Sequence, residues 1–242
     1  MKTLVTAGRV LNQLRHDPRT IALIMVVPNV FMALLWWLYS EQDTDAVFNS
    51  IAPSMLGIFP LILMFVVTSI STLRERKSGT LERLLTMPLS KGSFMGGYAL
   101  AFGVLAAIQA VLTVLVSVYL LGMEVESSLW ALIGLAVLNG VLGASLGLLA
   151  SGFAQSEFQA VQFLPAFVLP QLLVCGLLMP RDQMPKVLER FSDFLPMTYA
   201  VDAMKEITSN SSPEVGTDVL VLALFIVISL VGASVTLRRR TD

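Results

Sequence analysis

The residues best suited to recognise another molecule form one charged block at positions 74–85. The block reads Arg-Glu-Arg-Lys-Ser-Gly-Thr-Leu-Glu-Arg-Leu-Leu and lies between two long apolar stretches. The pattern predicts a short helix in which Thr80 is the N-cap and Glu82 lies in the first turn, where an acid is favoured. Leucines form its apolar side, and Pro88 ends it. Such a helix suits a groove on a soluble partner protein; the alternative is an ordinary basic loop lying on lipid.

Residues for catalysis or metal binding are scarce. The 242 residues include one cysteine, Cys175, and one histidine, His16. A single histidine excludes a histidine-based metal cluster within one chain. A membrane-embedded enzyme would need a nucleophile–base pair or a metal site, and the sequence offers neither. We therefore expect no catalytic or metal-binding residues and no nucleic-acid partner.

The elements that hold the charged block are predicted to be membrane-spanning helices. The chain is 55% hydrophobic and 14% charged, whereas soluble domains carry about 25% charged residues. A span needs about 20 apolar residues, and six segments satisfy this: 20–39, 51–73, 99–121, 129–150, 158–180 and 219–237. None has Asp, Glu, Lys or Arg in its middle. The predicted fold is an all-α integral membrane protein with a single transmembrane domain over residues 1–242.

Charge asymmetry predicts the orientation of these spans. Most of the 16 basic residues lie in the N-terminal segment, the 74–98 connection and the C-terminal segment, whereas the connections 40–50 and 122–128 carry acids and no base. Basic connections stay on the cytoplasmic side. We therefore predict that both termini and the 74–98 connection are cytoplasmic.

Two segments outside the spans are predicted to lie at the membrane surface. Residues 3–18 favour an amphipathic helix on the inner surface, with a frayed tail as the alternative; its apolar and basic sides are Leu4, Val5, Val10, Leu11 and Leu14, and Arg9, Arg15 and Arg19. On the outer face, residues 181–217 predict two short interfacial helices that either dip into the outer leaflet or cap a cavity. Pro196 stops the first, and Thr198 caps the second.

Polar and small residues inside the spans predict contacts between helices. Gly143 and Gly147 are spaced for close helix approach. Buried amides usually hydrogen-bond between helices; the alternative is that some line a substrate path, for which the candidates are Gln109, Asn139, Gln162 and Gln171. Glu157 is interpreted as a favourable charge at the start of the fifth span.

Residues 75–88 (Glu-Arg-Lys-Ser-Gly-Thr-Leu-Glu-Arg-Leu-Leu-Thr-Met-Pro) resemble the signature of ABC-2 type transporter permeases, nearest to the bacterial drug-resistance branch. The outer stretches 176–180 (Gly-Leu-Leu-Met-Pro) and 195–201 (Leu-Pro-Met-Thr-Tyr-Ala-Val), with Met184-Pro185 between them, resemble that family's outer-loop pattern. The resemblance implies a homodimeric or heterodimeric membrane subunit whose coupling helix sits on a separate ATP-binding subunit. The residues it assigns to that contact are Glu75, Arg76, Gly79, Thr80, Leu81, Glu82, Arg83 and Leu84.

The expected function is therefore the permease subunit of an ATP-driven exporter that works by alternating access. No Gly-x-x-x-x-Gly-Lys-[Ser/Thr] motif occurs in the sequence, so ATP and Mg²⁺ are expected on the partner and no cofactor on this chain. Because the spans lack charge, an apolar or amphiphilic cargo is expected. The alternatives are a stand-alone secondary transporter or channel, which usually needs intramembrane charges, and a membrane assembly protein that transports nothing.

Overall fold

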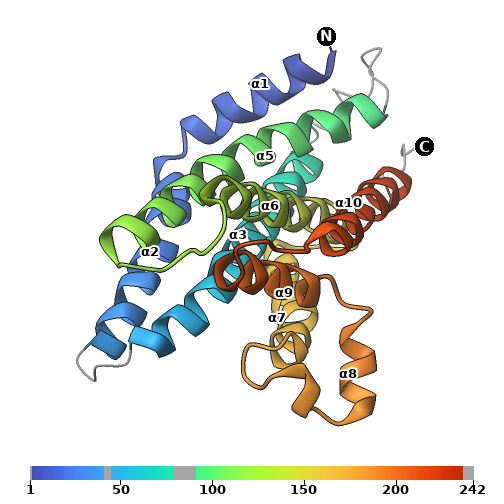
Figure 1. The fold of residues 1–242 in the computed structure, drawn as a ribbon. Helices are drawn as coiled ribbons and strands as arrows, with labels where there is room; N and C mark the ends of the chain where they lie inside the picture. The colour runs from blue at the N-terminus through green and yellow to red at the C-terminus, as the bar shows by residue number, and fades with distance from the viewer. Residues whose placement is uncertain (1, 41–44, 79–90, 237–242) are drawn as a thin grey trace.

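The computed structural model describes residues 2–40, 45–78 and 91–236, and these described residues fold into helices with no strand among them (Figure 1). The helices are α1 (Lys2–Arg15), α2 (Pro18–Ser40), α3 (Asp45–Lys77), α5 (Lys91–Leu115), α6 (Leu129–Ser151), α7 (Glu157–Val174), α8 (Lys186–Ser192), α9 (Pro196–Ser209) and α10 (Gly216–Thr236). A π-helical turn at Val116–Leu120 extends α5, and a 3₁₀ turn at Arg181–Gln183 precedes α8.

Six of these helices are long and apolar enough to cross a membrane, which confirms the six-span prediction. The bounds differ by more than three residues in three spans, one of which is the third, where α5 begins at Lys91 instead of 99. The second span begins earlier and ends later than predicted, because α3 runs unbroken from Asp45 to Lys77 and includes the first charged residues of the block. The fifth span is shorter, since α7 ends at Val174 instead of 180. There Gly176 adopts a positive φ of 82°, a conformation that glycine accepts readily and that commonly ends a helix.

The centre of the molecule is a tight seam between α3 and α6. A Cβ atom added to Gly143 would collide with the carbonyl oxygen of Leu61, and one added to Gly147 would lie 2.5 Å from the carbonyl oxygen of Phe65. On the neighbouring stripe, a Cβ atom at Gly140 would lie 2.5 Å from the Cβ of Ala106 in α5. The small residues of α6 therefore let two helices of the same chain approach it at backbone distance.

Helix ends meet at two separate ends of the molecule. At one end, Gly152 after α6 lies against Thr236 at the end of α10, and α1 begins on the same side of the molecule (Figure 1). At the other end, the backbone N–H of Glu124 donates to Oδ1 of Asn49 near the start of α3, over 3.1 Å. Which of these two ends faces the cytoplasm stays a prediction from the charge asymmetry.

The N-terminal helix packs against other helices of the protein, whereas the sequence predicts that it lies on the inner membrane surface. α1 runs along α5 (Figure 1), and its buried side includes Val10 and Leu14, whereas Leu4 and Val5 are exposed. Asp17 then caps α2: Oδ1 accepts from the Thr20 backbone N–H and Oδ2 from its hydroxyl. These hydrogen bonds lower the pKa of Asp17, because they favour the charged carboxylate.

The outer segment differs from the prediction in the role of its second helix. α9 begins at Pro196, not after Thr198, because proline is well placed in a first helical turn. One face of α9 is buried against α3, α6 and α10, so it is a core helix and not an interfacial one. α8, by contrast, exposes Val187 and Phe191.

An arginine holds the outer segment together. Arg181 donates to Asp202 of α9 over 2.9 Å and to Asp193 after α8, and its Nε donates to the hydroxyl of Ser192. Burial raises the pKa of Asp202, and the pairing with Arg181 opposes that shift. The segment between α7 and α9 is thus tied to the core by a polar cluster.

Candidate functional site

The last turn of α3 places Glu75 in a buried network with two other helices. Only 5% of the Glu75 surface is exposed. Arg9 of α1 donates through Nη1 and Nη2 to the two carboxylate oxygens, over 3.0 and 3.2 Å, and Nη2 also donates to the Tyr98 hydroxyl of α5 over 2.9 Å. A guanidinium matched to both oxygens of a carboxylate fixes geometry as well as charge. The Arg9–Glu75–Tyr98 contact therefore ties the start of the charged block to α1 and α5.

A second ion pair ties the same turn of α3 to α7. Arg74 donates through Nε to Oε1 of Glu157 over 2.9 Å and through Nη2 to Oε2 over 3.0 Å. The two side chains are 59% and 48% exposed, so the pair contributes little to stability, on the order of 0.5 kcal/mol. The pair matters for where α7 begins relative to α3, because Glu157 is the first residue of α7.

Arg76 is the one residue of this turn that lacks its hydrogen bonds in the described part of the chain. Its Nε and Nη2 atoms are buried without a partner there, and so is the hydroxyl of Thr72, one turn earlier on α3. A buried donor without an acceptor carries a free-energy cost. Arg76 can therefore donate hydrogen bonds to an oxygen of another molecule or segment.

The structure describes only two of the eight predicted docking residues. Glu75 and Arg76 belong to α3, and the Glu75 carboxylate is already occupied by Arg9 within the chain. The other six lie outside the described residues: Gly79, Thr80, Leu81, Glu82, Arg83 and Leu84. Their contact with a partner stays a prediction.

The structure does not bring the four candidate amides together. Gln109 is buried in α5 and donates to Thr113 of the same helix. Gln171 of α7 is buried, donates to the Phe167 carbonyl and accepts from the Met197 backbone N–H of α9. Gln162 is exposed on α7. Gln171 therefore links α7 to α9, as expected of a buried amide that hydrogen-bonds between helices.

Asn139 is the exception among these amides. It is fully buried in α6, and neither its oxygen nor its nitrogen has a hydrogen-bond partner among the described residues. Its Nδ2 lies 3.2 Å from the position of a Cβ atom added to Gly57 of α3. The absent side chain of Gly57 thus leaves the room that Asn139 occupies.

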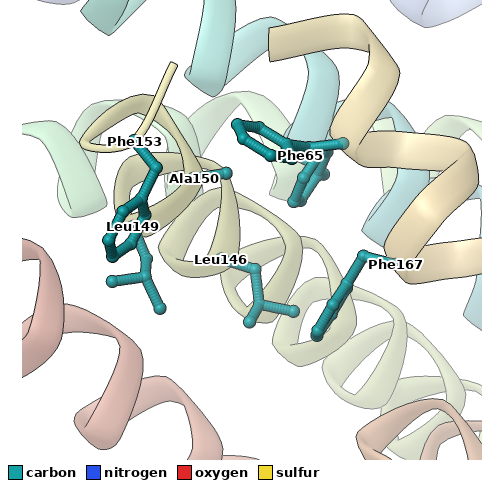
Figure 2. A pocket seen from close by; sticks show the side chains of 7 residues that line it. Phe65, Leu146, Leu149, Ala150, Phe153 and Phe167 are labelled. Atoms are coloured by element: carbon teal, nitrogen blue, oxygen red, sulfur yellow. The ribbon is translucent and has the colours of Figure 1, made fainter. Parts of the chain in front are cut away.

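An apolar cavity of about 200 Å³ lies where α3, α6 and α7 meet (Figure 2). Its walls are almost entirely carbon. The lining residues are Phe65 of α3, Leu146, Leu149 and Ala150 of α6, Phe153 just after α6, and Phe163 and Phe167 of α7. None of the four candidate amides lines it.

Sequence reasoning missed the partners in these contacts. It assigned Arg9 to lipid head groups, whereas the structure places Arg9 on Glu75 and Tyr98. It placed Glu157 correctly at the start of a helix but did not pair it with Arg74. The one available signal was that Glu75 and Glu157 are among the few acids on a side rich in bases. No sequence pattern indicated the cavity, because each of its lining residues is of a type that is common in apolar spans.

Comparison with known proteins gives a consistent result. The family model described as ABC-2 type transporter matches residues 2–208. The probable multidrug ABC transporter permease YbhR of Escherichia coli is 28% identical over 157 residues, which are 65% of this chain and 43% of that protein. The linearmycin resistance permease protein LnrN of Bacillus subtilis is 27% identical over 177 residues, 72% of this chain and 45% of that protein.

A eukaryotic relative matches as well. ABC transporter G family member 20 of Dictyostelium discoideum is 27% identical over 157 residues, which are 65% of this chain and 22% of that protein. The matched stretch therefore covers less than half the length of each of these relatives.

Proposed function

We propose, because the chain belongs to the ABC-2 type transporter family, that it is the membrane-spanning permease subunit of an ATP-binding-cassette exporter. The match of the family model to residues 2–208 is the observation that carries the proposal. The six apolar helices make the chain a multi-pass membrane protein, and we assign it to the cytoplasmic membrane, where it would act as a pair with a second copy or a homologous permease.

The energy source is assigned to another protein. The sequence contains no phosphate-binding Gly-x-x-x-x-Gly-Lys-[Ser/Thr] loop, so we place ATP and Mg²⁺ on a separate ATP-binding subunit. The charged block would dock on that subunit, through Glu82 and its neighbours. Arg76 supports this assignment, because its Nε and Nη2 atoms, near the start of the block, are buried without a partner among the described residues.

The substrate is proposed to be apolar or amphiphilic and to move outward. The carbon-lined cavity between α3, α6 and α7 supports this class of substrate, since it offers no partner for a charged group. The names of the relatives YbhR and LnrN, a multidrug permease and a linearmycin resistance permease, favour a drug-like or antibiotic-like cargo.

Co-purification tests the assignment of the docking segment. Tagged chain is isolated from its native membrane in mild detergent, and the accompanying proteins are identified. We expect an ATP-binding subunit, and we expect Glu82→Lys to lose it because the substitution reverses a charge in the docking segment. The matched control is Glu126→Lys, the same change in an exposed residue of the connection between α5 and α6, at the predicted outer end. Retention of the subunit by Glu82→Lys would remove Glu82 from the contact.

A transport measurement tests the export function itself. Cells that express the chain with its ATP-binding subunit are loaded with a panel of fluorescent amphiphiles, and accumulation is compared with cells carrying the Glu82→Lys chain. Lower accumulation with the native chain is expected. Equal accumulation across the panel would contradict outward transport of amphiphiles, and uptake by the purified chain alone, driven by an ion gradient, would favour a secondary transporter.

A further inference from the structure

We infer that the cavity between α3, α6 and α7 binds the apolar end of an amphiphile, a hydrocarbon ring or chain segment that enters from the cytoplasmic half of the bilayer. This inference rests on the proposed function and deepens it, because it names the part of the substrate that the chain holds and the place where it is held. The cavity is called the Phe65 cavity below and comprises the seven lining residues given above.

The size and walls of the Phe65 cavity select the ligand. Its volume is about 200 Å³. An apolar cavity of about 150 Å³ in another protein stays dry and binds benzene, so the Phe65 cavity is large enough for one aromatic ring or a short run of methylene groups. A polar group moved into it would lose its hydrogen bonds with water and find almost none in return, at a cost of about 2 kcal/mol or more. The head of an amphiphile must therefore remain outside.

Aromatic rings on three sides give the cavity its shape. Phe65 comes from α3 and Phe153 follows α6 (Figure 2). Phe163 and Phe167 are four residues apart, and so lie one turn apart on the same face of α7. Rigid aromatic side chains offer a large contact area at little conformational cost. Ala150 supplies the small wall that leaves the space between them open.

The cavity lies toward the cytoplasmic end and is open to the surroundings of the helices. Phe153 directly follows Gly152, which lies against Thr236 at the end of the molecule that the charge asymmetry assigns to the cytoplasm. Phe153 is 61% exposed and Phe167 42% exposed. An apolar chain in the inner leaflet can therefore reach the cavity without crossing water.

The helix α7 forms one wall and is anchored at both ends by polar contacts. At its first residue, Glu157 accepts two hydrogen bonds from Arg74 of α3. Near its last residue, Gln171 accepts from the Met197 backbone of α9. Phe163 and Phe167 lie between these anchors, so the position of α7 sets the width of the cavity.

Fluorescence quenching tests the inference on the full chain in lipid nanodiscs. The native tryptophans Trp36, Trp37 and Trp130 are all exposed and are replaced by Phe, and Phe163→Trp places a single reporter in the cavity wall. The probe is an alkyl phosphocholine that carries bromine on its terminal carbons. A bound probe quenches the reporter in a saturable way at low mole fraction, whereas collisions within the bilayer give quenching that rises linearly.

The expected result is saturable quenching that is lost when Ala150→Phe fills the cavity. The matched control, Leu220→Phe, adds a ring on the exposed side of α10, where Leu220 is 67% exposed, and should leave the saturable component intact. Leu146→Phe fills the cavity from another position and serves if Ala150→Phe does not fold, as judged by gel filtration. Linear quenching in the parent chain, or saturable quenching that survives both filling variants, would overturn the inference.

A second arm separates the two sources of such a chain. Phospholipid brominated along its acyl chains replaces the single-chain probe. Saturable quenching by this lipid, lost in Ala150→Phe, assigns the site to a chain of a two-chain membrane lipid; saturable quenching by the alkyl phosphocholine alone assigns it to single-chain amphiphiles. The measurement needs neither ATP nor a partner subunit, so a failed site leaves the exporter assignment standing, and a failed exporter assignment leaves the binding result interpretable.

Discussion

At the scale of single residues, Glu75 shows how far the charged block could be interpreted from the sequence. The charged block could be recognised in the sequence, but the contact that each of its charged side chains makes could not. Glu75 looks like a solvent-facing docking residue in the sequence, yet it is buried against Arg9, which lies 66 positions away. A pairing over that separation depends on how α1 packs across α5 and α3, and no local pattern encodes it.

The Arg9–Glu75 contact predicts unequal effects of two arginine substitutions on α1. Arg9→Ala leaves a carboxylate buried without its partner, and removal of one partner of a buried pair costs about 3–5 kcal/mol. Because Arg9 itself is one-third exposed, water reaches the site, and we expect a loss nearer about 2 kcal/mol. Arg15→Ala, at an exposed base on the same helix, should change stability by less than about 0.5 kcal/mol. Thermal unfolding in detergent measures both, and equal losses would contradict the buried pair.

At the scale of helices, the spans were predictable because length and apolarity define them. The sequence predicted close packing between these spans, but it did not identify which helices pack together. The small residues of α6 predicted close packing against another helix, but the sequence did not indicate that this helix is α3 of the same chain. The end of α7 and the start of α9 were misplaced because Gly176 and Pro196 were not recognised as helix-ending and helix-starting residues.

The seam between α3 and α6 predicts opposite effects of two glycine substitutions in one helix. Gly143→Ala forces a methyl group into the Leu61 backbone and should destabilise the protein by about 1–3 kcal/mol, as overpacked cores do. A methyl group added at Gly134, also in α6, meets nothing within 4 Å. Gly134→Ala should therefore be neutral or stabilising by up to about 1 kcal/mol, because alanine favours helix more than glycine does. Unfolding in denaturant measures both, and a harmless Gly143→Ala would show that the helices are not in backbone contact.

At the scale of the whole molecule, two ion pairs join the start of the charged block to separate parts of the bundle. Arg9–Glu75 joins α3 to α1, and Arg74–Glu157 joins α3 to α7. The six spans and the class of function followed from the sequence, but the cavity did not. Its walls come from α3, α6 and α7, and only the packing of these helices shows that their side chains enclose a space.

The Arg74–Glu157 pair predicts a charge-reversal rescue. Under the proposed function, Arg74→Glu and Glu157→Arg should each lower export per ATP hydrolysed, since like charges separate α3 from the start of α7. The double substitution restores opposite charges and should recover much of that ratio, although Asp17 lies near Arg74 and will oppose a glutamate there. Arg19→Glu, at an exposed base of α2, is the control. The ratio of export to ATP hydrolysis in proteoliposomes is measured, and a double variant no better than either single one would contradict the coupling.

The backbone contact between Gly143 and Leu61 also has a mechanical consequence. Together with the contact between Gly147 and Phe65, it holds the middle of α3, and the helix continues to Lys77, roughly 24 Å beyond Leu61 at 1.5 Å per residue. A rotation of about 10° around that point displaces the tip of such a rod by about 4 Å. The half of α3 beyond Leu61 thus converts a change of angle inside the bilayer into a sideways step at the membrane surface, at the position where the charged block continues.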